Sequence, residues 1–145
     1  MSDFDQAGFE VRFGWAGELA RLSHGAAAVV VVDVLRFTTC VSVAVARGAE
    51  ILPYRWRDAT AERFARDQHA ELAGRREDSS AKWSLSPTDL LRVPPGTRLV
   101  LPSPNGATLS LQAATACDHV YAGCLRNATA VAEAVAVAVA VAVAV

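Results

Sequence analysis

Several patterns that define known classes of protein are absent from this sequence of 145 residues. Its three cysteines have no CxxC spacing and its three scattered histidines form no HExxH motif, which argues against a disulfide framework and a zinc site. The phosphate loop GxxxxGK(S/T) and the GxSxG nucleophile elbow do not occur either. The sequence therefore gives no support for the nucleotide-binding and hydrolase classes that these motifs define.

The net charge of the chain argues against two further classes of binding partner. The net charge is −1, from 14 basic and 15 acidic residues, which predicts neither a nucleic-acid partner nor binding to an anionic membrane. The chain is 52% apolar, which suits one domain with a sizeable core. Residues 1–10 are acidic and contain no apolar signal region. With unpaired cysteines as well, we expect a cytoplasmic protein.

Apolar runs alternate with helical patterns along the chain. The run at 26–34, AAAVVVVDV, is apolar almost throughout, as in a strand covered on both faces, and residues 9–15 alternate like a half-buried strand. Further strands are predicted at 50–54, 97–102 and 119–123, and helices at 38–48, 58–74, 86–93, 107–116 and from about 127. This order predicts an α/β domain with a mainly parallel sheet and helices on both faces.

The last stretch of the sequence differs from the rest. Residues 130–145 read AVAEAVAVAVAVAVAV, in which both alternating residue types are apolar. Neither a strand nor a helix formed there would be amphipathic, and the run is too short for a convincing transmembrane helix. We therefore expect an α/β domain over residues 1–129 and a low-complexity tail over 130–145.

Polar residues follow three of the predicted strands, each time just before a helix begins. The three turns contain Asp33, Arg36, Thr38 and Thr39; then Ser103, Asn105, Gly106 and Thr108; and finally Gly123, Arg126 and Asn127. Ligands of open α/β sheets bind at the carboxyl ends of the strands. Helix N-termini at that edge present unpaired N–H groups and the positive end of the helix dipole. The three turns together predict an anion-binding site.

The first turn carries the most chemistry. Asp33 offers a carboxylate, a ligand that Mg²⁺ favours, and Arg36 can form a two-pronged contact with a phosphate or carboxylate. The hydroxyls of Thr38 and Thr39 could hold anion oxygens. Two structural alternatives stay open: Asp33 caps the helix, or it forms an ion pair with Arg36. Asn-Gly at 105–106 is likewise compatible with an ordinary turn.

Taken in order, these turns resemble the 2-phosphosulfolactate phosphatase family. The matching stretches are residues 29–53, 101–109 and 122–132, and WSLSP at 83–87 is similar to that family's central Ser-Pro loop. The resemblance extends over about residues 9–133. It implies a three-layer α/β/α fold and an Mg²⁺-dependent phosphatase. Such an enzyme would hydrolyse a small anionic phosphomonoester, 2-phosphosulfolactate, in coenzyme M biosynthesis.

The resemblance also implies roles for individual residues. Asp33 and Arg36 would be catalytic, with Asp33 holding the metal. Substrate contacts would come from Thr38, Thr39, Ser86, Asn105, Gly106, Arg126 and Asn127. Arg75 stands where many members have an acidic residue, so Glu77 is the candidate second metal ligand. Members of the family are usually longer, so we expect the fold to be incomplete at the C-terminus.

Two other interpretations remain open at this point. The same turns could bind a phosphorylated metabolite without catalysis, or the chain could be an inactive, truncated fragment. No covalent nucleophile can be identified, so direct attack by water and a phosphoenzyme are both compatible with the sequence. An arginine does not distinguish a sulfonate from a carboxylate, and a homo-oligomer is neither predicted nor excluded.

Overall fold

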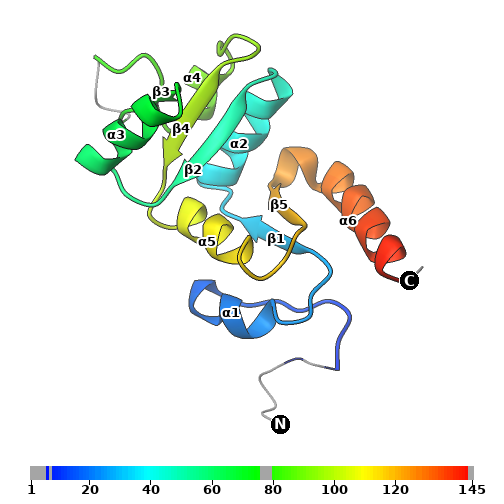
Figure 1. Cartoon of the computed structure of the whole chain (residues 1–145). Coiled ribbons are helices and arrows are strands. Elements are labelled where there is room, and N and C mark those ends of the chain that lie inside the picture. Colours follow the sequence, from blue (N-terminus) through cyan, green and yellow to red (C-terminus); the bar gives the residue numbers. More distant parts are fainter. Residues whose placement is uncertain (1–5, 7, 76–79, 144–145) are drawn as a thin grey trace.

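The computed structural model describes residue 6, residues 8–75 and residues 80–143. Helices and strands alternate along most of this length (Figure 1). In chain order the elements are η1 (Ala16–Glu18), α1 (Leu19–Leu22), β1 (Val29–Val32), α2 (Phe37–Ala46), β2 (Glu50–Tyr54), α3 (Ala59–Asp67), β3 (Glu71–Leu72), α4 (Pro87–Leu90), β4 (Arg98–Pro102), α5 (Gly106–Ala113), β5 (Val120–Gly123), η2 (Leu125–Asn127) and α6 (Ala128–Val143).

The strands run parallel in two sheets. One sheet has the order β1-β5, with Val32 opposite Gly123, and the other has the order β2-β4-β3, with Tyr54 opposite Pro102. Helices pack on the strands, so the predicted α/β class with parallel strands is confirmed. Within the described residues the strands nevertheless form two sheets, whereas we expected one.

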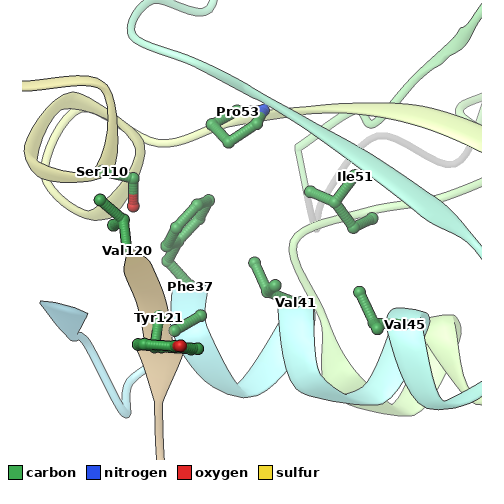
Figure 2. A pocket seen from close by; sticks show the side chains of 9 residues that line it. Phe37, Val41, Val45, Ile51, Pro53, Ser110, Val120 and Tyr121 are labelled. Carbon is green, nitrogen blue, oxygen red and sulfur yellow. The ribbon is translucent and has the colours of Figure 1, made fainter. Parts of the chain in front are cut away.

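A proline helps to explain the division into two sheets. The N–H of Glu50 and the C=O of Tyr54 both bond to the β4 side, at 2.8 Å and 3.0 Å, so Pro53 lies on the opposite edge of β2. Proline has no N–H to donate, and this edge therefore cannot form a complete ladder with another strand. An apolar cavity of about 220 Å³ separates it from β5, lined by the residues labelled in Figure 2 and by Ala122.

The core lies around β4. Leu99, Val100 and Leu101 of this strand are fully buried, as a continuous apolar run predicts for a central strand. Helix α2 contacts β2 and β5, and α5 contacts β1, β2 and β5, so these two helices bridge the sheets. Phe37, at the start of α2, is buried in the same core. The carboxyl ends of strands from both sheets are thereby held together.

Two predicted strands differ from expectation. Residues 9–15 form no strand, so that prediction is wrong. Strand β1 is covered on one face only, because Val31 is buried while Val30 and Val32 are 39% and 63% exposed. The apolar pattern of 26–34 cannot distinguish a central strand from one at the edge of a two-stranded sheet, which is where β1 lies.

The helix predicted at 58–74 is shorter than expected. It ends at Asp67, because His69 adopts a left-handed conformation (φ 51°) and the N–H of Ala70 donates to the C=O of Ala65 at 2.8 Å. Strand β3, which the sequence analysis missed, follows directly. Residues 130–143 continue helix α6, whose alanines favour a helix. No helix within the described residues is long and apolar enough to span a membrane.

Candidate functional site

The turn after β1 is held by the two threonines that follow it. The N–H of Asp33 donates to Oγ1 of Thr38 at 3.0 Å, and the N–H of Thr38 donates back to the C=O of Asp33 at 3.0 Å. Oγ1 of Thr39 donates to the C=O of Val34 at 2.8 Å. Both hydroxyls therefore bond to the backbone of the turn, and Thr38 is fully buried there.

The charged side chains of the same turn have no such partners. The half-buried carboxylate of Asp33 and the guanidinium of Arg36 form no hydrogen bond or ion pair, with each other or with any other described residue. Arg36, not Asp33, occupies the N-cap position of α2, and it makes no capping bond. The two structural alternatives for Asp33, a helix cap and an ion pair with Arg36, are thus both absent within the part of the chain described.

Backbone donors lie next to these groups. Thr38 and Cys40 donate their N–H groups to the turn, whereas the N–H groups of Phe37 and Thr39 have no acceptor within the described residues. Unpaired N–H groups in the first turn of a helix favour an anion, and the positive end of the helix dipole adds to this preference. The start of α2 therefore combines a carboxylate, a guanidinium and donors for an anion.

The turn after β4 packs directly against the first. A Cβ atom added to Gly106 would lie 2.4–2.6 Å from atoms of Phe37, so only glycine allows α5 to begin this close to α2. The N–H of Gly106 donates to Oγ of buried Ser103 at 3.1 Å. Asn105 is exposed and makes no capping bond, and Oγ1 of Thr108 is buried without a partner. The structure thus brings the first two predicted turns together.

The turn after β5 uses its polar side chains differently. Oδ1 of Asn127 accepts the N–H of Cys124 at 2.8 Å, and Nδ2 donates to the C=O of Ala122 at 2.9 Å. Nη1 of Arg126 donates to both the C=O and Oγ of Ser42 in α2, at 2.9 Å and 2.8 Å. Both side chains therefore connect η2 to its surroundings, and a role for either in substrate binding remains a prediction.

The Ser-Pro loop leads into a carboxylate that the sequence analysis did not identify as part of the site. Asp89, in α4, accepts a 2.5 Å hydrogen bond from Oγ of buried Ser84 and lies 3.6 Å from Arg92. Helix α4 packs against α2. Ser86 is the N-cap of α4 but its hydroxyl makes no capping bond. The acidic residue after Ser-Pro was the available signal for a second carboxylate near α2.

The pKa of the buried Cys40 thiol is affected by charged residues of both the first turn and α4. Burial raises the pKa of Cys40 to about 12; Arg36 lowers it, and Asp33 and Asp89 raise it further. Charged groups from the first turn and from α4 therefore act on the same side chain in α2. A thiol with so high a pKa is protonated at neutral pH and is not an activated nucleophile.

Arg57, which the sequence analysis did not identify, lies at the carboxyl ends of strands β3 and β4. Arg57 donates to the C=O of Ala73, after β3, and to the C=O of Pro102, at the end of β4, both at 3.1 Å. It also lines a cavity of about 280 Å³ at the start of α3, together with Arg75. Arg57 thus connects two strand ends directly before the turn that contains Ser103.

Few side chains at this site could bind a metal ion. Within the described residues no cluster of three or more acidic, histidine or cysteine side chains could hold a metal. Glu77, the predicted second ligand, lies outside the described residues. Mg²⁺ is commonly held by one or two carboxylates, with waters and substrate phosphate completing its shell. The unpaired, half-buried carboxylate of Asp33 fits that kind of site.

The fold and these turns define an α/β protein with helix N-termini, a carboxylate and an arginine gathered at the carboxyl ends of parallel strands. The family model for 2-phosphosulpholactate phosphatase matches residues 17–145, so the chain belongs to that family. No curated protein and no solved structure matches the chain. The family is a phosphatase family, and its members' substrates are phosphoesters.

Proposed function

We propose that this chain is an Mg²⁺-dependent phosphatase that hydrolyses a small phosphorylated acid, 2-phosphosulfolactate, to sulfolactate and phosphate. The observation that carries the proposal is that the side chains of Asp33 and Arg36, at the carboxyl end of β1, have no hydrogen-bond or ion-pair partner among the described residues. A half-buried carboxylate and a guanidinium without partners are poor choices for stability. They are suited to ligands that bind between them.

Each part of the site has a task in this reaction. Arg36 grips two phosphoryl oxygens through its planar fork, and the N–H groups at the starts of α2 and α5 bind the remaining anionic oxygens. Asp33 holds the metal. When bound, Mg²⁺ neutralises charge on the phosphoryl group and polarises it toward attack. Gly106 positions the second turn, and Asn105 is exposed beside it as a further donor.

Three side chains of α2 that could in principle attack the phosphorus atom are unsuited to that role. The pKa of Cys40 is raised to about 12, mainly by burial, so this thiol is not a nucleophile at neutral pH. Thr38 and Thr39 use their hydroxyls to hold the turn. We therefore assign the attack to water, with phosphate and sulfolactate as the products. A cytoplasmic location is part of the proposal, since all three cysteines are free, buried thiols.

A binding module without catalysis is the second candidate. It is favoured by the single unpaired carboxylate at the turn, because Asp89 is already bonded to Ser84. Phosphate release from 2-phosphosulfolactate and from other phospho-acids, measured with Mg²⁺ and with a chelator, tests both. We expect release that the chelator abolishes. Calorimetric binding of the ester without any release would instead favour the binding module, and neither binding nor release would refute both.

A further inference from the structure

Residues 9–15 form neither a helix nor a strand, and their apolar side chains are not covered by the described part of the chain. Phe9, Val11, Phe13 and Trp15 are 68%, 86%, 72% and 79% exposed, and they occupy every second position. The rings of Phe13 and Trp15 contact each other edge-to-face, with centroids 5.9 Å apart. Contiguous exposed apolar side chains of this kind mark an interaction surface.

One residue of this segment, Phe13, makes a pair of backbone hydrogen bonds to a side chain. Nε2 of Gln6 donates to the C=O of Phe13 at 2.7 Å, and the N–H of Phe13 donates to Oε1 of Gln6 at 2.8 Å. A residue in a sheet makes the same pair of bonds to its neighbouring strand. Arg12 anchors the segment at the end of α1 by donating to the C=O groups of Leu22 and His24, at 3.2 Å and 2.9 Å.

The same chain contains an open strand edge. The N–H of Val29 donates to the C=O of His119 at 2.8 Å, so in β1 the backbone groups of Val30 and Val32 face away from β5. Within the described residues β1 pairs with β5 alone. The side chains of Val30 and Val32 are also partly exposed. An open apolar edge of this kind is a template for a further strand.

We propose that residues 9–15 of one copy of this chain add as a strand to the outer edge of β1 in a second copy. A segment with an exposed apolar residue at every second position and an open strand edge occur in one chain, and pairing between the two in a second copy would make the interface self-complementary. Self-complementarity is what a two-fold symmetric dimer requires. The polypeptide N–H and C=O groups would provide the pairing, and the exposed rings would cover the uncovered face of β1.

The area available is adequate for a specific dimer. A buried aromatic side chain removes about 150–250 Å² from water, so the three rings of each of the two segments would together bury roughly 900–1,500 Å², and the surfaces that receive them add to this area. Specific interfaces bury about 1,200–2,000 Å² in total. Because β1 ends at Asp33, the partner's segment would lie alongside the strand that leads into the first turn. The inference does not depend on the proposed phosphatase activity.

Sedimentation of the full chain over a range of concentrations tests the dimer. We expect a dimer for the wild type and at least about a tenfold weaker association for V11S/F13S and for Val32→Lys, which places a charge on the receiving edge. Trp56→Ser is the matched control, because Trp56 is 56% exposed but lies outside both surfaces. A monomeric wild type, or equal weakening by Trp56→Ser, would overturn the proposal.

Cross-linking identifies which surfaces meet. Copies with Val11→Cys are mixed with copies with Val32→Cys, and disulfide-linked dimers are separated under non-reducing conditions. The three native cysteines are buried and serve as the background in unmodified chain. Linkage between the two kinds of copy supports strand exchange. Linkage only between two Val11→Cys copies would show the segments pairing with each other and would overturn the assigned edge.

Discussion

The turns after β1 and β5 look alike in the sequence but use their side chains in opposite ways. After β5, Asn127 satisfies backbone groups of Cys124 and Ala122, and Arg126 bonds to Ser42. After β1, two threonine hydroxyls perform the corresponding task. Asp33 and Arg36 are consequently left without partners among the described residues.

The difference teaches how a polar turn becomes a candidate site. Every turn has backbone donors and acceptors that must be satisfied, and some polar side chains are always used for that purpose. Where short hydroxyl side chains suffice, longer charged groups remain available for a ligand. The two turns therefore provide a matched pair, in which equivalent substitutions should affect activity at one and stability at the other.

Asp33→Asn gives the largest expected effect on activity. It removes the charge that would hold Mg²⁺ but keeps the shape, so we expect Mg²⁺-dependent phosphate release to fall by about 10²–10³-fold. Thermal unfolding should change little, because the carboxylate has no partner among the residues that the structure describes. Asn127→Asp is the comparison: losing its bond to Ala122 should cost about 1–2 kcal/mol of stability, and its activity should fall less than that of Asp33→Asn. Normal activity in Asp33→Asn would remove this residue from the site.

Arg36→Lys should have the next largest effect on activity. Lysine keeps the charge but not the planar, two-pronged contact, which contributes about 1.5–3 kcal/mol. We therefore expect kcat/KM to fall by roughly 10- to 150-fold. Arg126→Lys, in the turn after β5, should lower kcat/KM less than Arg36→Lys does, because Arg126 already bonds to Ser42. Equal kinetic losses in the two variants would mean that the distinction between the turns is wrong.

Gly106→Ala tests the contact that joins the first two turns. The added Cβ would overlap the ring of Phe37, and overpacking of this kind costs about 1–3 kcal/mol. Denaturant unfolding should show that loss, and the double variant with Phe37→Leu should recover part of it. Gly8→Ala is the control, because nothing lies within 4 Å of a Cβ at that position. A neutral Gly106→Ala would show that the two helix starts are not held by this contact.

At neutral pH the smallest expected effect comes from Cys40, whose titration changes stability only under alkaline conditions. Its pKa is raised from 9.0 to about 12, chiefly by burial, so the thiol ionises in the unfolded chain first. The folded state should be fully stable below about pH 9 and should lose stability as the pH rises toward 12. Unfolding free energies of wild type and Cys40→Ala, measured across that range, should diverge in this direction. Parallel curves would show that the thiol is not buried as described.

Several elements could be predicted from local sequence because one local signal dominates each. Strand β2 has the predicted bounds. The first residues of β4, α5 and β5 each lie one residue from the predicted start. The end of α3 was missed because it uses a left-handed His69 rather than a glycine. Strand β3 was missed because a two-residue strand is defined by its partner β4, which no local pattern reveals.

The sequence by itself determined the α/β alternation, the polar turns after β1, β4 and β5, and the family to which those turns belong. These follow from residue type and spacing along the chain. Only the tertiary structure decided which polar side chains hold a turn and which stay unpaired. It also decided that Gly106 meets Phe37, that Asp89 approaches α2, and that residues 9–15 and one edge of β1 are uncovered. The physical reason is that hydrogen-bond satisfaction and burial depend on neighbours distant in the sequence, which residue periodicity does not specify.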